Sequence, residues 1–322
     1  MNKHKNLIKK AASIALLLFI SFVQTNAQDT KKFYNRQWKE CQPNEARFLS
    51  ITTKTDSGYY RKDYYIREKR LQMAGLYADS LCKIRNGFFA YYHSNGVPAH
   101  LERFRQNRKE GVAKSYYRNS YMADSAVYHD GKIVGVKLSW HENGYSRDSI
   151  SLQEDESGVS ASWFDNGMPS SAGRFSKDIK QNGKWVYYHK NGQVSSIEIY
   201  DQSKLVDKQY FDEQGELMKD TTNNDRMAQF KGGIEGFVHY IKRNVRFPSQ
   251  YRIVNGKRAL VEVSFTINEE GNIENVYTIS SLAEPFDKEV ESAILKSPKW
   301  EPARNHNRTI KQKYTMPVFF SN

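Results

Sequence analysis

A chain of 322 residues is long enough for two or three domains. Its net charge of +13 favours anionic partners or surfaces, yet no basic run with interleaved base-reading residues occurs, which argues against a nucleic-acid-binding protein. The sequence has no GxSxG motif, and its two cysteines form no CxxC pair, so we predict a protein that is not an enzyme and uses no cofactor.

The first 27 residues have the three parts of a secretory leader. Four lysines fall within the first ten residues, an apolar run spans residues 11–23, and Thr25-Asn26-Ala27 ends in a small residue suited to signal peptidase. The run is shorter than the ~20 residues that cross a bilayer, so we expect a cleaved signal peptide, with an uncleaved inner-membrane anchor as the alternative. Cleavage removes four lysines and no acid, which lowers the basic count from 49 to 45 against 36 acids, a net charge of +9.

Residues 28–58 are polar with scattered apolar positions, and we expect them to form a lead-in strand or cap for the region that follows. Cys41 lies in this segment and Cys82 lies beyond it. In an exported protein the two would form a disulfide, but two cysteines make no pattern, so a pair of buried free thiols is an equal alternative.

An aromatic ladder with a period of 23 to 25 residues runs through residues 59–219. Its rungs are Tyr92, Tyr116, Trp140, Trp163, Tyr188 and Phe211, after a degenerate first rung at Tyr65. A second apolar position follows twelve residues after each rung from Tyr65 to Tyr188, and turn dipeptides such as Asn95-Gly96, Asn143-Gly144 and Asp130-Gly131 separate the halves. Twelve residues suit one strand and one turn, so each repeat is predicted to be a β-hairpin in one stacked sheet.

Three histidines, His93, His141 and His189, occupy the same position in alternate repeats. Three histidines would suit zinc, whose nitrogen ligands lie within ~2.1 Å of the metal. Two hairpins, however, contain four strands about 4.8 Å apart, which separates successive histidines by about 20 Å. We therefore predict no metal site and interpret the histidines as solvated or stacked on aromatic rings. The rungs are interpreted as a buried or cross-strand-paired face, with a carbohydrate- or peptide-stacking surface as the alternative.

Residues 88–96 and 183–192 both have an aromatic stretch that ends in Asn-Gly. These segments resemble the MORN-type repeat in its bacterial, antitoxin-like variant, and the resemblance covers roughly residues 59–219. It implies an elongated array of β-hairpins that binds proteins or lipids. An antitoxin-like role is therefore one alternative for the function.

The sequence changes character after a polar linker over residues 220–229. Apolar residues at helical spacing predict a helix over 234–245, and alternation predicts strands over 259–267 and 273–279. A second helix over 285–296 and a last strand over 310–320 complete the order. The whole chain is thus predicted to be mainly β, with a C-terminal α+β domain of two helices and three strands over residues 230–322.

This order of elements resembles the C-terminal domain of TonB and its relatives over residues 230–320. The motifs that carry the resemblance are Phe247-Pro248, the turn at 268–273, Phe286-Asp287, the segment 298–303 and the closing segment 314–320. The resemblance implies a periplasmic domain that is not an enzyme and that grips an extended segment of an outer-membrane transporter. Such a segment would be bound by adding a strand to an open sheet edge.

If the domain is built like its relatives, the strand over 310–320 is the pairing edge. The candidate partner-binding residues on this strand are Ile310, Lys311, Gln312, Lys313 and Tyr314. Lys311 and Lys313 would face outward and discourage casual edge pairing. Arg304, His306 and Arg308 precede the strand as a basic loop, which would meet an acidic partner or simply be solvated.

Two features depart from the TonB pattern: the leader is short, and none of the eight prolines forms a proline-rich spacer. We therefore predict a non-catalytic exported protein of the periplasm or cell envelope, in which the ladder is a stiff stalk or docking surface that presents residues 230–320 to a protein partner. The alternative is a TonB-type energy transducer or accessory, anchored in the inner membrane by its leader and supporting transport through outer-membrane receptors. The chain would associate with a membrane only in that case, and the sequence names no oligomeric state.

Overall fold

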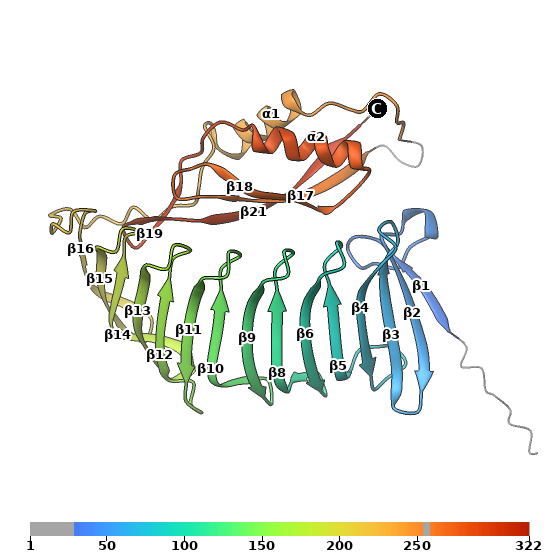
Figure 1. Ribbon diagram of the computed structural model, residues 1–322, viewed down its shortest axis with the longest axis horizontal. Helices are drawn as coiled ribbons and strands as arrows, with labels where there is room; N and C mark the ends of the chain where they lie inside the picture. Colours follow the sequence, from blue (N-terminus) through green and yellow to red (C-terminus); the bar gives the residue numbers. More distant parts are fainter. Residues whose placement is uncertain (1–28, 254–257, 322) are drawn as a thin grey trace, which may run out of the picture.

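The computed structural model describes residues 29–253 and 258–321, so the expected signal peptide lies outside the described residues. The described chain forms a long single-layer sheet, with an α+β domain lying along one rim of it (Figure 1). No helix of the described part is long and apolar enough to cross a bilayer. The predicted fold class, mainly β with a C-terminal α+β domain, is confirmed.

The long sheet has 16 antiparallel strands among the described residues, paired in chain order except that the two-residue β7 pairs with β6 alone. Its strands are β1 (Thr30–Tyr34), β2 (Phe48–Thr55), β3 (Gly58–Tyr65), β4 (Arg70–Tyr77), β5 (Arg85–Tyr92), β6 (Pro98–Arg105), β7 (Arg108–Lys109), β8 (Gly111–Tyr116), β9 (Met122–His129), β10 (Lys132–Trp140), β11 (Ser146–Leu152), β12 (Gly158–Trp163), β13 (Pro169–Ser176), β14 (Lys180–Tyr188), β15 (Val194–Asp201) and β16 (Lys204–Tyr210). We call this sheet the ladder. The prediction of a β-hairpin array is confirmed, and the segment over 28–58 supplies its first two strands.

Each rung from Tyr92 to Tyr188 is the last residue of its strand, and a turn follows at once. In the first of these turns, His93 N donates to Val97 O at 2.8 Å and Gly96 N donates to His93 O at 2.8 Å. Only Gly96, with φ of 88°, has a left-handed backbone there, as in a type I turn closed by a glycine bulge. The turn asparagines are therefore not needed for their backbone angles, and their side chains have another use, described below.

The ladder has little hydrophobic interior. Its cluster of buried side chains among the described residues consists of Met73, Tyr77, Phe89 and Phe104. Phe89 meets Tyr77 and Phe104 edge to face, with ring centroids 5.1 and 5.3 Å apart. The rungs themselves are only half-buried. A sheet one layer thick must therefore rely on contacts between neighbouring repeats.

The C-terminal domain has the two predicted helices and three predicted strands in the predicted order, with two additional short strands before the last one. It consists of α1 (Gly233–Asn244), β17 (Ala259–Ile267), β18 (Ile273–Ser280), α2 (Glu284–Leu295), β19 (Ala303–Asn305), β20 (Arg308–Ile310) and β21 (Gln312–Phe320). The sheet order is β18-β17-β21, and both helices cover the face turned away from the ladder (Figure 1). Alternate residues of β17, such as Val263 and Phe265, are at most 1% exposed and form the core with Phe237 and Val290.

The basic loop predicted before the last strand is instead a hairpin. β19 and β20 pair antiparallel, and the two residues between them, His306 and Asn307, have φ of 54° and 58°. Two consecutive left-handed residues make the tight two-residue turn that matches strand twist. The last strand therefore begins at Gln312 rather than Ile310, because Ile310 ends β20.

Cys41 and Cys82 are both free thiols in the structure, so no disulfide joins the lead-in segment to the first repeats. Cys82 Sγ lies 3.9 Å from Thr52 Oγ1 on β2.

Candidate partner-binding edge and its attachment to the ladder

β21 forms one edge of the three-stranded sheet. It pairs with β17 over nine consecutive residues without a register shift, from Gln312 opposite Ile267 to Phe320 opposite Ala259. Within the described residues no strand pairs with its other side. An unpaired strand edge presents a row of backbone N–H and C=O groups to any chain that can align with it.

Proline at position 317 is consistent with this edge. Proline has no N–H to donate, so within a sheet it is found where the N–H would face away from the neighbouring strand. We infer that residues of the same parity, namely Thr315 and Phe319, also direct their backbone groups away from β17. Phe319 is 58% exposed.

The opposite edge of the sheet is less suited to pairing. β18 has two register shifts against β17 and a left-handed residue, Asn275, with φ of 53°. Glu291 of α2 accepts hydrogen bonds from Thr278 N at 2.8 Å and from Thr278 Oγ1 at 2.7 Å. Because a carboxylate already occupies that backbone donor, β21 is the better edge for an added strand.

The linker before α1 contacts two side chains at the start of β21. Ala228 N donates to Gln312 Oε1 at 2.6 Å, and Tyr314 Oη donates to Ala228 O at 2.5 Å. Of the predicted partner-binding residues, Gln312 and Tyr314 are thus engaged within the chain. Among the described residues, no hydrogen bond joins the linker to Thr315 or to the residues after it on β21.

Hydrogen bonds that join each repeat to the next line the rim beneath this domain. The residue after a rung donates from its side chain to the carbonyl of the next rung: His93 Nε2 to Tyr116 O (2.8 Å), Tyr117 Oη to Trp140 O (2.7 Å), His141 Nε2 to Trp163 O (2.8 Å) and His189 Nε2 to Phe211 O (2.9 Å). The three histidines therefore act as inter-repeat donors, which is neither of the roles expected from the sequence.

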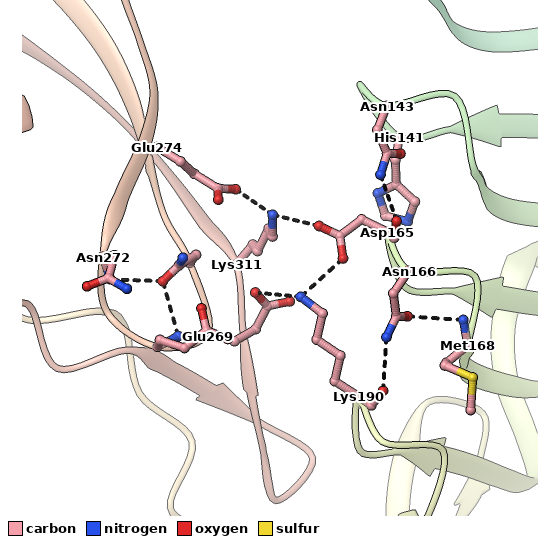
Figure 2. Close-up of polar contacts among 12 residues, drawn as sticks. His141, Asn143, Asp165, Asn166, Met168, Lys190, Glu269, Asn272, Glu274 and Lys311 are labelled. Carbon is pink, nitrogen blue, oxygen red and sulfur yellow. Dashed lines mark hydrogen bonds and ion pairs between the residues drawn. The ribbon is translucent and has the colours of Figure 1, made fainter.

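The turn asparagines form a second row of such bonds. Each amide donates to a backbone carbonyl of the following turn: Asn95 to Arg118, Asn119 to Glu142, Asn143 to Asp165, Asn166 to Lys190 and Asn191 to Glu213, over 2.7 to 3.2 Å. Figure 2 shows two of them beside the C-terminal domain. These bonds make the rim a fixed row of turns on which the domain rests.

One place in the first row lacks a ladder donor, because Phe164 follows the rung Trp163. Its acceptor, Tyr188 O, receives a hydrogen bond from Arg308 Nη1 of β20 at 2.8 Å. The Arg308 guanidinium lies 5.1 Å from the Phe164 ring centroid and also donates to Ser170 O. Burial lowers the pKa of Arg308 to about 10, which still leaves the side chain charged at neutral pH. The C-terminal domain thus supplies the donor that this repeat lacks.

The turn of the β19–β20 hairpin is inserted against the last repeats. The His306 ring stacks on Tyr187 with centroids 3.6 Å apart, and His306 Nδ1 lies 3.0 Å from Glu198 Oε1. Asn307 Nδ2 donates to Phe211 O at 2.9 Å. Burial disfavours the charged form of Glu198, but hydrogen bonds from His306 and other side chains outweigh it and lower the pKa of that carboxyl.

A cluster of ion pairs lies between the domain and the turns that follow β12 and β14 (Figure 2). Lys311 Nζ lies 2.7 Å from Asp165 Oδ2 and also pairs with Glu274. Lys190 Nζ lies 3.1 Å from Asp165 Oδ1 and 3.2 Å from Glu269 Oε2, the latter an ion pair without hydrogen-bond geometry. Although burial opposes its charge, the two lysines lower the pKa of Asp165. Asp165 therefore links both lysines.

Further contacts hold the rest of the domain against the ladder. Arg36 Nη2 of the lead-in segment pairs with Glu262 Oε2 at 2.8 Å, and Arg118 lies 4.9 Å from the Tyr277 ring centroid. The contacts span the rim from β1 to β16, so the ladder is a docking surface for the domain of its own chain rather than a stalk that holds it at a distance (Figure 1).

Some of the predicted partner-binding residues contact the ladder, and others do not. Arg308 and Lys311 contact the ladder, and Arg304 Nη2 reaches only Asn307 O, at 3.5 Å. Lys313 stays exposed on β21, with Nζ 2.8 Å from Tyr277 Oη. The contacts of Arg308 and Lys311 with the ladder follow only from the folded arrangement.

Residues 244–321 match the family described as Gram-negative bacterial TonB protein C-terminal. The C-terminal domain is of this TonB type. The match runs from the last residue of α1 to the end of β21 and does not include the ladder. No curated protein matches the chain. The family match indicates a TonB-like envelope protein, whereas the resemblance of the ladder to MORN repeats stays a prediction.

Proposed function

We propose that this protein is a non-catalytic, exported scaffold whose TonB-type domain binds an extended segment of another envelope protein by strand addition to β21. The observation that carries the proposal is the regular edge from Thr315 to Phe320, which pairs with no second strand among the described residues and includes the exposed Phe319. Main-chain hydrogen bonds along such an edge give affinity, while alternate side chains select the segment. A segment of an outer-membrane transporter is the partner that the family match favours.

The ladder would serve to hold this edge in place. Its repeats are joined by side-chain bonds, and the domain contacts it from Arg36 to Arg308, so the edge has a fixed position on a rigid base. A binding edge that is already ordered loses less entropy when a partner segment docks.

The test introduces a photo-crosslinking side chain at Phe319 in cells that export the protein. We expect a crosslink to one envelope protein, and we expect Thr315→Pro to abolish it, because proline removes an outward N–H without removing a bond to β17. Thr315→Ala is the matched control and should leave the crosslink intact. An equally strong crosslink in the proline variant, with an unchanged unfolding midpoint, would argue against strand addition.

Export is tested separately by N-terminal sequencing of the mature protein. We expect the chain to start at Gln28, directly after the predicted cleavage site. An intact leader retained in the inner membrane would instead support the anchored transducer.

A further inference from the structure

A cavity of about 510 Å³ lies where the lead-in segment meets the C-terminal domain, at the far end of the sheet from the β19–β20 hairpin. Its size falls within the ~300–1,000 Å³ range of small-molecule sites. One wall comes from residues 44–47 with Arg36, and the other from residues 251–253, 258–260 and 280–283 with Phe286. The proposed strand addition to β21 does not use this cavity.

Part of the cavity is apolar. Phe286 is 3% exposed, and its ring meets the Tyr251 ring edge to face with centroids 5.2 Å apart. Leu260 and Leu282 also line it. An aromatic or aliphatic group would find a matching surface here, as in most ligand sites.

The charged lining is strongly unbalanced. Four arginines, Arg36, Arg47, Arg252 and Arg258, face a single lining acid, Glu45. Arg47 is already neutralised by two hydrogen bonds to Glu68, at 2.5 and 2.7 Å.

The other three arginines have guanidinium N–H donors without a hydrogen-bond partner among the described residues. Arg36 uses Nη2 to pair with Glu262, while its Nη1 is buried and has no hydrogen-bond partner among the described residues. Arg252 and Arg258 are exposed, and neither makes a hydrogen bond or ion pair with the described part of the chain. A buried donor without a partner is costly, and guanidinium groups bind carboxylate and phosphate through paired hydrogen bonds.

We propose that this cavity binds an oxyanion carried on an apolar group, that is, a ligand with a carboxylate or phosphate beside a ring or short aliphatic chain. The anion would lie between Arg252 and Arg258, and the apolar part against Tyr251 and Phe286. Because the two walls come from the lead-in segment and the C-terminal domain, such a ligand also bridges them.

The test measures binding of phenyl phosphate, phenylacetate and neutral 2-phenylethanol to the purified protein by ligand-detected NMR titration. We expect both anions to bind more tightly than the alcohol. The Arg252→Ala/Arg258→Ala double variant should weaken the anions by about tenfold or more, the effect of losing one charged contact. Tighter binding of the phosphate or of the carboxylate identifies which oxyanion the site prefers.

The matched control is Lys242→Ala/Arg243→Ala, which removes the same charge from exposed positions of α1 outside the cavity. It should bind all three probes like the wild type. The proposal is overturned if the alcohol binds as tightly as the anions, if no probe binds, or if both double variants weaken the anions equally. The last outcome would mean that only net charge matters.

Discussion

Arg308 Nη1 donates to Tyr188 O across 2.8 Å, in the place where other repeats use a side chain of the ladder itself. His93, Tyr117 and His141 fill the equivalent place further along the rim, each with a bond of 2.7 to 2.8 Å to the next rung. The ladder therefore has one gap in its own bonding, and the C-terminal domain fills it.

Arg308→Met should destabilise the protein by about 1–3 kcal/mol, the usual cost of leaving buried acceptors without a donor. Methionine keeps much of the side-chain volume, so the loss reports the missing hydrogen bonds to Tyr188 O and Ser170 O. The measurement is the free energy of unfolding in urea.

The gap also predicts a rescue. Phe164→His would place a donor at the position that His141 and His189 hold in their repeats, so it should recover part of the loss in an Arg308→Met background. Phe164→Leu, which adds no donor, is the control. If Phe164→His and Phe164→Leu give the same stability in the Arg308→Met background, Arg308 does not replace a missing donor at position 164.

Glu198 makes stability depend on pH. Its pKa is lowered in the folded state, since the bonds from His306, Tyr200 and Ser196 outweigh the effect of burial. A carboxyl with a depressed folded pKa contributes stability that is fully present above its unfolded pKa, about 4.3–4.5, and is lost as pH falls through the folded value. We therefore expect the stability that Glu198 contributes to be lost below about pH 5.

Glu198→Gln keeps the size of the side chain and removes this titration. We expect the unfolding free energy of the wild type to fall more steeply than that of the variant from about pH 5 to pH 3, so that the two converge at low pH. Glu216→Gln, which replaces an exposed acid of the turn after Phe211, is the control and should follow the wild type. Parallel curves for wild type and Glu198→Gln would contradict the prediction.

Most of the fold could be predicted from the sequence because its signals are local and periodic. The aromatic period and the Asn-Gly turns predict hairpins, and the alternation in β17 predicts a half-buried strand. The β19–β20 hairpin was missed because its strands have three residues each and its turn, His306-Asn307, lacks a glycine. A segment that short has no period to detect.

The contact between the domain and the ladder could not be predicted for a different reason. Whether Lys311 meets a partner or Asp165 depends on how two separately folded parts pack, and no periodicity within either part encodes that packing. The sequence does carry one signal of this contact. Phe164 interrupts a series of side-chain donors, and such an interruption indicates a carbonyl that must find its donor elsewhere.

Asp165→Asn should loosen the domain from the rim, because it removes the acid that pairs with both Lys311 and Lys190. The charged groups are partly exposed, so we expect the free energy that holds the domain on the rim to fall by only about 0.5–1 kcal/mol. The effect should be smaller at high salt, which screens the ion pairs. The measurement is the rate of limited proteolysis in the linker over residues 220–229, which should rise. Asp130→Asn, which breaks the exposed pair with Arg108 inside the ladder, should leave that rate unchanged.

Gly173→Ala tests the packing of the ladder itself. A Cβ at this position would lie 2.1 Å from the ring of Trp185, which is 4% exposed and donates from Nε1 to Arg174 O at 3.0 Å. Gly173 has no left-handed φ, so its backbone conformation is open to alanine. Without the overlap, alanine would stabilise the protein by about 0.4–1 kcal/mol, because it reduces the conformational entropy of the unfolded chain. Displacing the buried indole costs about 1–3 kcal/mol. This steric cost exceeds the gain from the unfolded state, so urea unfolding should show a lower free energy of unfolding for the variant. Ser171→Ala on the same strand adds no Cβ and is the control. A Gly173→Ala protein as stable as wild type would mean that Trp185 moves aside without cost.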